Sequence, residues 1–210
     1  MRPVGLVILA AGGSTRLGRP KQLVAYQGRS LLRHAAEVAV GSLCRPIVVV
    51  LGAHAAELEP EVRDLPVQVA ENRDWARGMA TSLRCGLEVL QDTHAGIGAA
   101  VIMLCDQPLV SPPAIDALVQ AYRSGVRPIV ASIYAGTLGV PALFDRHFIP
   151  ELLALEGEAG ARRIIARHPG EVHGIPLSGG GLDIDTPQDC EQLHAGASRP
   201  STRRETGEAP

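Results

Sequence analysis

The sequence predicts an α/β protein with a single three-layer α/β/α Rossmann-like domain and a mostly parallel sheet. Apolar runs of strand length alternate with amphipathic helical patterns over about 130 residues, and several of these runs are rich in β-branched residues. The 210 residues are 46% hydrophobic and 20% charged, which excludes a wholly disordered chain. Such alternation forms right-handed βαβ crossovers, which place helices on both faces of a parallel sheet.

Five strands are expected in the alternating part of the chain. A strand covered on both faces is recognised by an unbroken apolar run, because neither face meets water. The first run, 4–10, ends in Gly12-Gly13, and the second, 47–51, reads IVVVL. The other expected strands cover 66–70, 99–105 and 128–133.

Helices are expected between these strands. Ser30 is placed to cap a helix that runs to about residue 43, and Ser111 to cap one whose first turn holds two prolines. Apolar residues spaced three and four apart mark one face of the patterns. The further helices of this part are expected at 53–63 and 78–90.

The alternation of apolar runs and helical patterns changes after the fifth expected strand. Residues 134–143 hold two glycines and a proline, which predicts an excursion beyond the sheet. Helices are expected at 144–155 and 158–167, short strands at 171–176 and 183–185, and a last helix at 187–194. The stretch 195–210 has no apolar residue larger than alanine, which predicts a disordered tail after a domain that ends at residue 194.

Composition excludes several functional classes. A net charge of −2 and 3% aromatic residues give no basic field or stacking platform, so no nucleic-acid partner is expected. No segment approaches the roughly 20 apolar residues of a membrane span, and the first apolar run breaks into glycines, so we expect a cytoplasmic protein with no membrane partner. No C-x-x-C pair occurs among the cysteines, which we expect to be reduced thiols: Cys44, Cys85, Cys105 and Cys190.

A glycine-rich loop follows the first expected strand, at the sheet edge where ligands of such folds bind. It reads Leu9-Ala10-Ala11-Gly12-Gly13-Ser14-Thr15-Arg16 and continues to Lys21. Small residues let backbone N–H groups approach a phosphate, and Arg16 and Lys21 add positive charge. The loop matches neither the Rossmann nor the Walker pattern, since Arg19 stands where a Walker lysine is required. From these residues alone, a strand-to-helix turn with solvated charges is an equal alternative.

Carboxylates follow two of the later apolar segments. Asp106 ends the strand expected at 99–105, where Mg²⁺ ligation and a turn or capping role are both open. Asp183 and Asp185 alternate along an expected strand and so face opposite sides, which leaves only one of them able to face the loop.

Taken together, these segments resemble one family. The loop resembles the L-A-A-G-x-S-x-R-x-G-x-x-K signature of the nucleotidyltransferase superfamily with the GT-A-like Rossmann-type fold, and within it the MobA/MocA-like proteins of molybdenum cofactor synthesis. Cys105-Asp106-Gln107-Pro108 resembles that group's C-D-x-P element, and residues 72–83 resemble its N-x-x-W-x-x-G-M-x-x-S-L element. Further elements match in order over about residues 4–193: Gly139-Val140-Pro141 with Phe144, Gly160-Ala161-Arg162, and Asp183-Ile184-Asp185-Thr186-Pro187.

The resemblance implies nucleotidyl transfer from a nucleoside triphosphate to a phosphorylated small molecule, with release of pyrophosphate. It favours CTP over GTP, because the L-A-A-G opening is closer to the cytidylyl branch, and molybdopterin as the acceptor. It implies Mg²⁺ on Asp106 and Asp185, and catalytic roles for Arg16, Lys21 and Asp106. The implied nucleotide site consists of Leu9, Ala10, Ala11, Gly12, Gly13, Ser14, Arg16, Lys21, Gly78, Ser82 and Asp106.

Several alternatives stay open. By resemblance Gly78 and Ser82 approach the base and ribose, but they also fit an ordinary helix start. Trp75 is expected to anchor the core more than to stack on a base, and Asp185 is also placed to cap the last expected helix. Val140 stands where molybdopterin-modifying members carry histidine. Another phosphorylated metabolite, such as methylerythritol phosphate, is therefore the alternative candidate for the acceptor.

Other kinds of function are also considered. A non-catalytic nucleotide-binding accessory domain is the second hypothesis, although Lys21 and Asp106 are both present. NAD-dependent oxidoreduction is the third, but no acidic residue ends the second strand. Transient contact with a molybdoenzyme or its chaperone is the protein partner that the resemblance implies.

Overall fold

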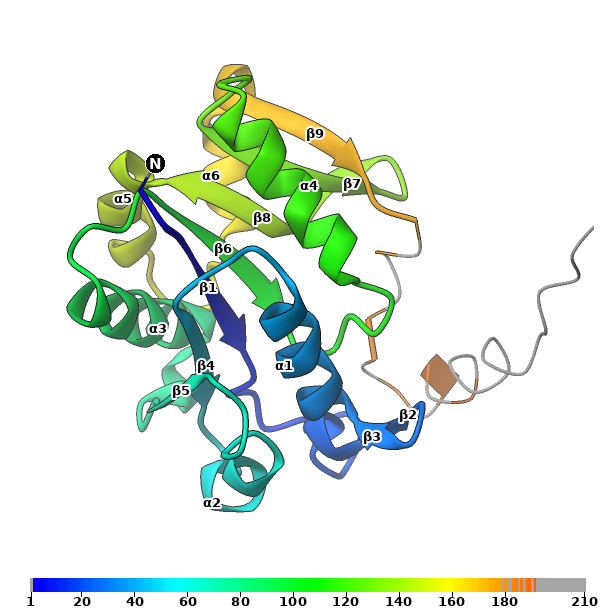
Figure 1. The fold of residues 1–210 in the computed structure, drawn as a ribbon. Helices are drawn as coiled ribbons and strands as arrows, with labels where there is room; N and C mark the ends of the chain where they lie inside the picture. Colours follow the sequence, from blue (N-terminus) through cyan, green and yellow to red (C-terminus); the bar gives the residue numbers. More distant parts are fainter. Residues whose placement is uncertain are drawn as a thin grey trace, which may run out of the picture.

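The computed structural model describes residues 2–178 together with 180, 183, 184, 186, 188, 189 and 191. Within them, a central sheet of seven strands has the order β5-β4-β1-β6-β8-β7-β9. β8 is antiparallel to both of its neighbours, and the other pairings are parallel. The strands are β1 (Val4–Leu9), β4 (Ile47–Leu51), β5 (Gln68–Glu71), β6 (Ala99–Leu104), β7 (Ile129–Tyr134), β8 (Thr137–Asp145) and β9 (Val172–Pro176). The predicted mostly parallel α/β/α fold is confirmed (Figure 1).

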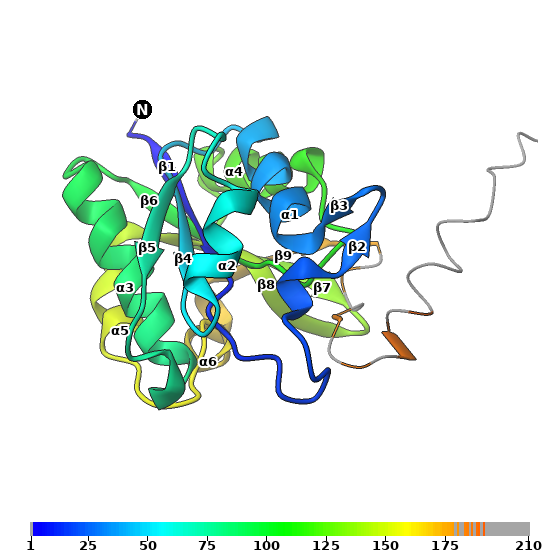
Figure 2. The same cartoon turned by 90° about the horizontal axis from the view of Figure 1, so that it is seen from below.

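Helices cover both faces of the sheet (Figures 1 and 2). One hydrophobic cluster joins the sheet to α1 (Leu31–Gly41), α2 (Ala55–Leu58) and α4 (Pro112–Arg123). A second cluster joins the opposite face to α3 (Met79–Thr93), α5 (Ile149–Leu153) and α6 (Arg162–Arg167). Successive residues of β1 alternate between the two clusters, as side chains of a strand buried on both faces must. None of the described helices is long and apolar enough to cross a bilayer.

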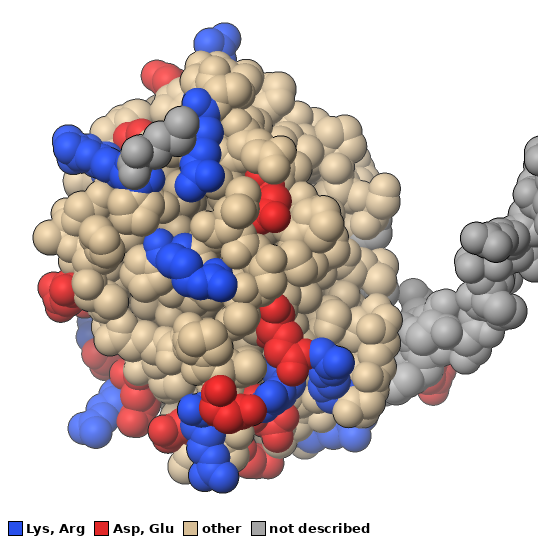
Figure 3. Space-filling view, viewed as in Figure 1, with Lys and Arg blue, Asp and Glu red and all other residues tan. Residues whose placement is uncertain are grey.

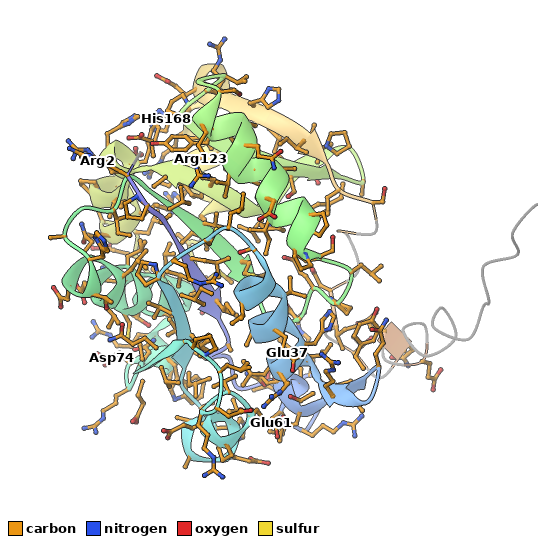
Figure 4. The ribbon with its side chains drawn as sticks, in the orientation of Figure 1. Arg2, Glu37, Glu61, Asp74, Arg123 and His168 are labelled. Atoms are coloured by element: carbon orange, nitrogen blue, oxygen red, sulfur yellow. The ribbon has the colours of Figure 1, made fainter. Side chains whose placement is uncertain are left out.

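A small hairpin and the cap of α1 lie beside the loop after β1. The hairpin consists of β2 (Ala25–Tyr26) and β3 (Arg29–Ser30). Ser30 Oγ accepts a hydrogen bond from Arg33 N at 3.1 Å, which confirms the predicted cap. Ser30 Oγ also donates to Glu61 at 2.6 Å. In Figure 4, Glu61 lies on the same side of the molecule as Glu37, a residue of α1. Ser111 occupies the predicted N-cap position of α4, with prolines in the first turn, but the predicted capping hydrogen bond of its hydroxyl is not formed.

The prediction that residues 134–143 leave the sheet is wrong. Ala135 (φ 49°) and Gly136 (φ 73°) form a two-residue hairpin turn, and the chain returns at once as β8, in the middle of the sheet. The proline that argued against a strand lies at a register shift between β7 and β8, where a residue without an N–H is tolerated.

The predicted helices of the second half begin too early. Phe144 belongs to β8, and the segment expected as a helix at 144–155 forms a 3₁₀ turn, Arg146–Phe148, followed by the short α5. The helix expected at 158–167 is reduced to α6. Asp183 and Ile184 lie in neither a helix nor a strand. Asp185, Cys190, most of the last expected helix and the tail 195–210 lie outside the described residues.

Charged side chains of both signs are spread over the face shown in Figure 3. Neither sign covers this face, in keeping with the net charge of −2. A broad basic surface of the kind that attracts nucleic acid is not present on it.

Candidate active site

A cavity of about 380 Å³ lies at the carboxyl ends of β1 and β6. Figure 2 views the molecule from this side. The wall is formed by the loop after β1, the start of α3, the residues that follow β6, and Glu158. All of the predicted nucleotide-binding residues except Arg16 line it: Leu9, Ala10, Ala11, Gly12, Gly13, Ser14, Lys21, Gly78, Ser82 and Asp106. Segments that are far apart in the sequence therefore meet in one cavity, and Arg16 is exposed outside its wall.

Gln22, which sequence reasoning missed, fixes the shape of the glycine loop. Its side chain is 1% exposed, and Nε2 donates to the carbonyls of Ala10 and Gly12, both at 2.8 Å. Ser14 Oγ donates to Gln22 Oε1 at 3.2 Å and accepts from Lys21 N at 2.9 Å. The buried amide of Gln22 thus forms hydrogen bonds with two carbonyls of the loop.

The same loop presents free donors. The backbone N–H groups of Gly12, Gly13 and Thr15 make no hydrogen bond with any described residue. Consecutive N–H groups in such a bend form a concave site that suits an anion.

Lys21 and Asp106 form an ion pair across the cavity. Lys21 Nζ lies 2.5 Å from Asp106 Oδ2, and the two side chains are 18% and 7% exposed. Lys21 begins the 3₁₀ turn Lys21–Leu23, and Asp106 follows β6, so the pair joins the glycine loop to the next strand of the sheet. Ile184 N donates to the Asp106 carbonyl at 3.2 Å, which brings the residues beyond β9 to the same place.

Asp106 carries a carboxylate oxygen of the kind that binds divalent cations. Its second oxygen, Oδ1, is buried and has no hydrogen-bond partner among the described residues. A buried carboxylate oxygen without a partner is costly, and hard oxygen ligands are those that Mg²⁺ and Mn²⁺ prefer. No group of three or more histidine, cysteine or acidic side chains that could hold a metal occurs in the described part of the chain. Asp185, the second carboxylate that the resemblance implies, lies outside the described residues.

Gly78 and Ser82 shape the wall at the start of α3. Gly78 has φ 109°, and a Cβ there would lie 2.3 Å from the carbonyl oxygen of Gly157, so no other residue fits. Ser82 is 6% exposed, and its Oγ accepts from Asn72 Nδ2 at 2.9 Å. Both residues line the cavity and also build the first turns of α3, so the two alternatives for them coexist.

The prediction that Trp75 anchors the core is wrong. Its side chain is exposed at the cavity, where it lies in the 3₁₀ turn Trp75–Arg77. A Cβ at Gly13 would lie 3.1 Å from the indole, and a Cβ at Gly52 would lie 2.8 Å from Trp75 Cβ. Two glycines thus make room for the tryptophan on the outside of the loop.

Two of the elements that carry the family resemblance, Gly139-Val140-Pro141 and Gly160-Ala161-Arg162, contribute no residue to the cavity wall. Arg162 is exposed and donates to the hydroxyl of Tyr134 at 3.1 Å, and that hydroxyl donates to the carbonyl of Val140 at 3.0 Å. A Cβ at Gly139 would lie 2.3 Å from the same hydroxyl oxygen, so this element packs tightly without a histidine.

The cysteines of the described part form no disulfide. Cys44 and Cys105 are buried, and burial raises the pKa of the Cys44 thiol to about 11 and that of Cys105 to about 12. Cys105 lines the cavity beside Asp106, but a protonated thiol does not serve there as a nucleophile.

Comparison with known proteins extends over most of the chain. Residues 6–172 match the model of the MobA-like NTP transferase domain. The chain is 32% identical over 198 residues to nicotine blue oxidoreductase of Paenarthrobacter nicotinovorans, which covers 89% of this chain and 94% of that protein. It is 27% identical to the purine catabolism protein PucB of Bacillus subtilis, with 91% and 96% covered.

Solved structures share the same fold. Rv0371c from Mycobacterium tuberculosis H37Rv superposes with a TM-score of 0.80 at 30% identity, covering 91% of this chain and 97% of that chain. A complex of Rv0371C with manganese gives a TM-score of 0.74 at 26% identity, with the same coverage. Molybdopterin-guanine dinucleotide biosynthesis protein A from Archaeoglobus fulgidus gives 0.64 at 16% identity, with 92% and 98% covered. With its glycine loop, Lys21 and Asp106 gathered in one cavity, the chain belongs to the MobA-like NTP transferase domain family.

Proposed function

We propose that this protein transfers a nucleoside monophosphate, CMP from CTP in the first instance, to a phosphorylated small molecule and releases pyrophosphate. One observation carries the proposal: the glycine loop and the start of α3 enclose one cavity in which Lys21 pairs with Asp106. Membership in an NTP transferase family makes a nucleoside triphosphate the natural occupant.

The roles follow from charge and from available donors. The N–H groups of Gly12, Gly13 and Thr15 donate hydrogen bonds to phosphate oxygens. Lys21 offsets the negative charge of the triphosphate and of the departing pyrophosphate. Arg16, exposed beside the loop, supplies further positive charge to the outgoing group. Because an acceptor phosphate is already ionised, it attacks the α-phosphorus without a general base, and positioning dominates the catalysis.

Asp106 is the residue that would hold a divalent cation, Mg²⁺ in our proposal, with Asp185 as the second carboxylate. The buried Oδ1 of Asp106, which has no hydrogen-bond partner among the described residues, supports this role. A solved structure that is 26% identical to this chain is a complex with manganese, which also supports it. When bound, the cation supplies charge neutralisation to the phosphate oxygens. Asp185 lies outside the described residues, so its part rests on the family resemblance alone.

We propose molybdopterin as the first acceptor to test, and transient contact with a molybdoenzyme or its chaperone as the corresponding partnership. Val140, in place of the histidine of the G-H-P element, keeps a different phosphorylated metabolite as the alternative. A cytoplasmic location suits either acceptor.

A second candidate function is oxidoreduction. It is favoured by the 32% identity to a protein named nicotine blue oxidoreductase over most of both chains. The same cavity would then take a nicotinamide dinucleotide, whose pyrophosphate has the same need for loop N–H groups. The loop lacks the G-x-G-x-x-G pattern of the usual dinucleotide fold, so we rank this function second.

Binding measurements separate the two functions. Isothermal titration is run with CTP, GTP, ATP, UTP, NADH and NADPH, each with and without Mg²⁺, on the wild type and Asp106→Asn. We expect metal-dependent binding of a triphosphate that Asp106→Asn loses, followed by pyrophosphate release when molybdopterin is added. Binding of NADH or NADPH, with none of any triphosphate, would favour the second function and refute the first.

A further inference from the structure

An acidic side chain lines a cavity that is otherwise suited to a polyanion. Glu158 lies in the loop between α5 and α6 and forms part of the wall that holds Lys21 and the glycine loop. Its carboxylate makes no hydrogen bond or ion pair with any described residue. No basic side chain among the described residues therefore explains why an acidic residue lines this cavity. Near a triphosphate, an unpaired carboxylate is repelled.

The loop that carries Glu158 is anchored to the start of α3. Ala80 N donates to the Gly157 carbonyl at 3.0 Å, and a Cβ at Gly78 would lie 2.9 Å from Glu158 N. A Cβ at Gly160 would lie 2.6 Å from Met79 Sδ. These contacts hold Glu158 against the α3 side of the cavity.

Exposure divides the cavity into a deep end and a rim. Lys21 and Asp106 are nearly buried and mark the deep end, where the phosphates bind in the proposed function. Glu158 is exposed, as are Trp75 (36%) and Met79 (39%), which offer apolar surface for a flat ring. In a nucleotide the base lies farthest from the phosphates. With the phosphates at the deep end, as the proposed function has them, the base would lie toward the rim that Glu158 lines.

We propose that Glu158 determines which nucleobase is accepted, by accepting a hydrogen bond from an exocyclic amino group. This inference rests on the proposed function. A carboxylate is only an acceptor, so it pairs with the exocyclic amino group of cytosine, guanine or adenine and faces an unfavourable oxygen in uracil. Such a pairing also explains why a negative charge is tolerated in this wall, because it lies at the end of the ligand remote from the triphosphate.

The test compares nucleotides that differ at the amino position: CTP against UTP, and GTP against ITP. Affinities are measured by isothermal titration for the wild type, Glu158→Gln and Glu158→Ala, with thermal melts to check folding. Glu156→Gln is the matched control, because Glu156 is exposed in the same loop but does not line the cavity. Loss of the charge strengthens the binding of every triphosphate, so the ratio within a pair is the readout.

We expect the wild type to prefer the amino-bearing member of a pair by about tenfold, as for a hydrogen bond to a charged group. Glu158→Gln removes or reverses this preference, because its amide donates to the oxygen of uracil. Glu156→Gln retains the preference. A ratio that is unchanged in Glu158→Gln overturns the inference and leaves the proposed function standing. An effect of Glu158→Gln that disappears with 2′-deoxy-CTP assigns the contact to the ribose and also overturns it. A wild type that binds no triphosphate overturns the proposed function and this inference with it.

Discussion

Replacing Gln22 with methionine keeps the approximate volume of a buried side chain and removes all of its hydrogen-bonding groups. In the wild type the amide donates to Ala10 and Gly12 at 2.8 Å each and accepts from Ser14 at 3.2 Å. Gly12 and Ser14 are near solvent and can turn to water, whereas Ala10 is 2% exposed. The carbonyl of Ala10 is therefore the group that is left without a partner.

The magnitude follows from that one buried carbonyl. An unsatisfied buried acceptor destabilises a fold by about 1–3 kcal/mol. A change of 1 kcal/mol moves the melting temperature of a chain of this size by about 2–4 °C, so Gln22→Met should lower it by about 4–8 °C at the middle of that range, about 2 kcal/mol. The loop that Gln22 orders is also the proposed phosphate site. The affinity for pyrophosphate, measured well below the melting temperature, should therefore fall by about tenfold.

Thermal unfolding and titration with magnesium pyrophosphate measure the two effects on one sample. Gln120→Met is the control, because Gln120 is exposed on α4, far from the cavity wall, and its replacement should change neither quantity. If the Gln22→Met protein melts within 1 °C of the wild type and binds pyrophosphate equally well, this amide does not fix the loop.

Three further predictions concern the cavity and the thiols. Asp106→Asn removes the charged oxygen suited to a cation, so added Mg²⁺ should no longer strengthen CTP binding in titration, and a retained metal effect contradicts the assignment. Lys21→Met should weaken binding of both CTP and pyrophosphate by about tenfold or more, since a charge-assisted contact is lost; equal affinities would exclude Lys21 from the phosphate site. Burial raises the thiol pKa of Cys44 to about 11 and of Cys105 to about 12, so both stay protonated at pH 8 and should resist iodoacetamide until urea unfolds the chain. Mass spectrometry of the alkylated protein tests this, with the half-buried Cys85 as the internal comparison, and rapid labelling of Cys105 in the folded protein would contradict it.

The sequence was most informative where a strand is buried on both faces. The runs expected at 4–10, 47–51 and 99–105 match β1, β4 and β6 to within one residue, because a strand covered on both faces is apolar throughout. β8 has six consecutive buried residues but was missed. Gly136 in the turn before it, and Gly139 and Pro141 within it, are ordinary loop signals, and only the tight turn at Ala135-Gly136 and the register shift beside β7 make them compatible with a central strand.

The glycine loop, Lys21 and Asp106 were predicted because each has a residue type tied to phosphate or metal chemistry, and each follows a strand that the sequence identifies. Parallel β1 and β6 are neighbours, so their carboxyl ends bring these residues into one cavity. Whether each residue acts as the resemblance implies stays a prediction.

Residues that serve the site indirectly have no such signal. Gln22 lies in a 3₁₀ turn and is buried because the two carbonyls it binds come from a loop that folds back over it, an arrangement that no periodicity encodes. Trp75 shows the converse. A lone tryptophan is usually a core residue, but Gly13 and Gly52 leave a surface on which the indole lies at the cavity rim. In both cases the side chain's role is set by backbone from another segment, so it becomes visible only when the tertiary contacts are known.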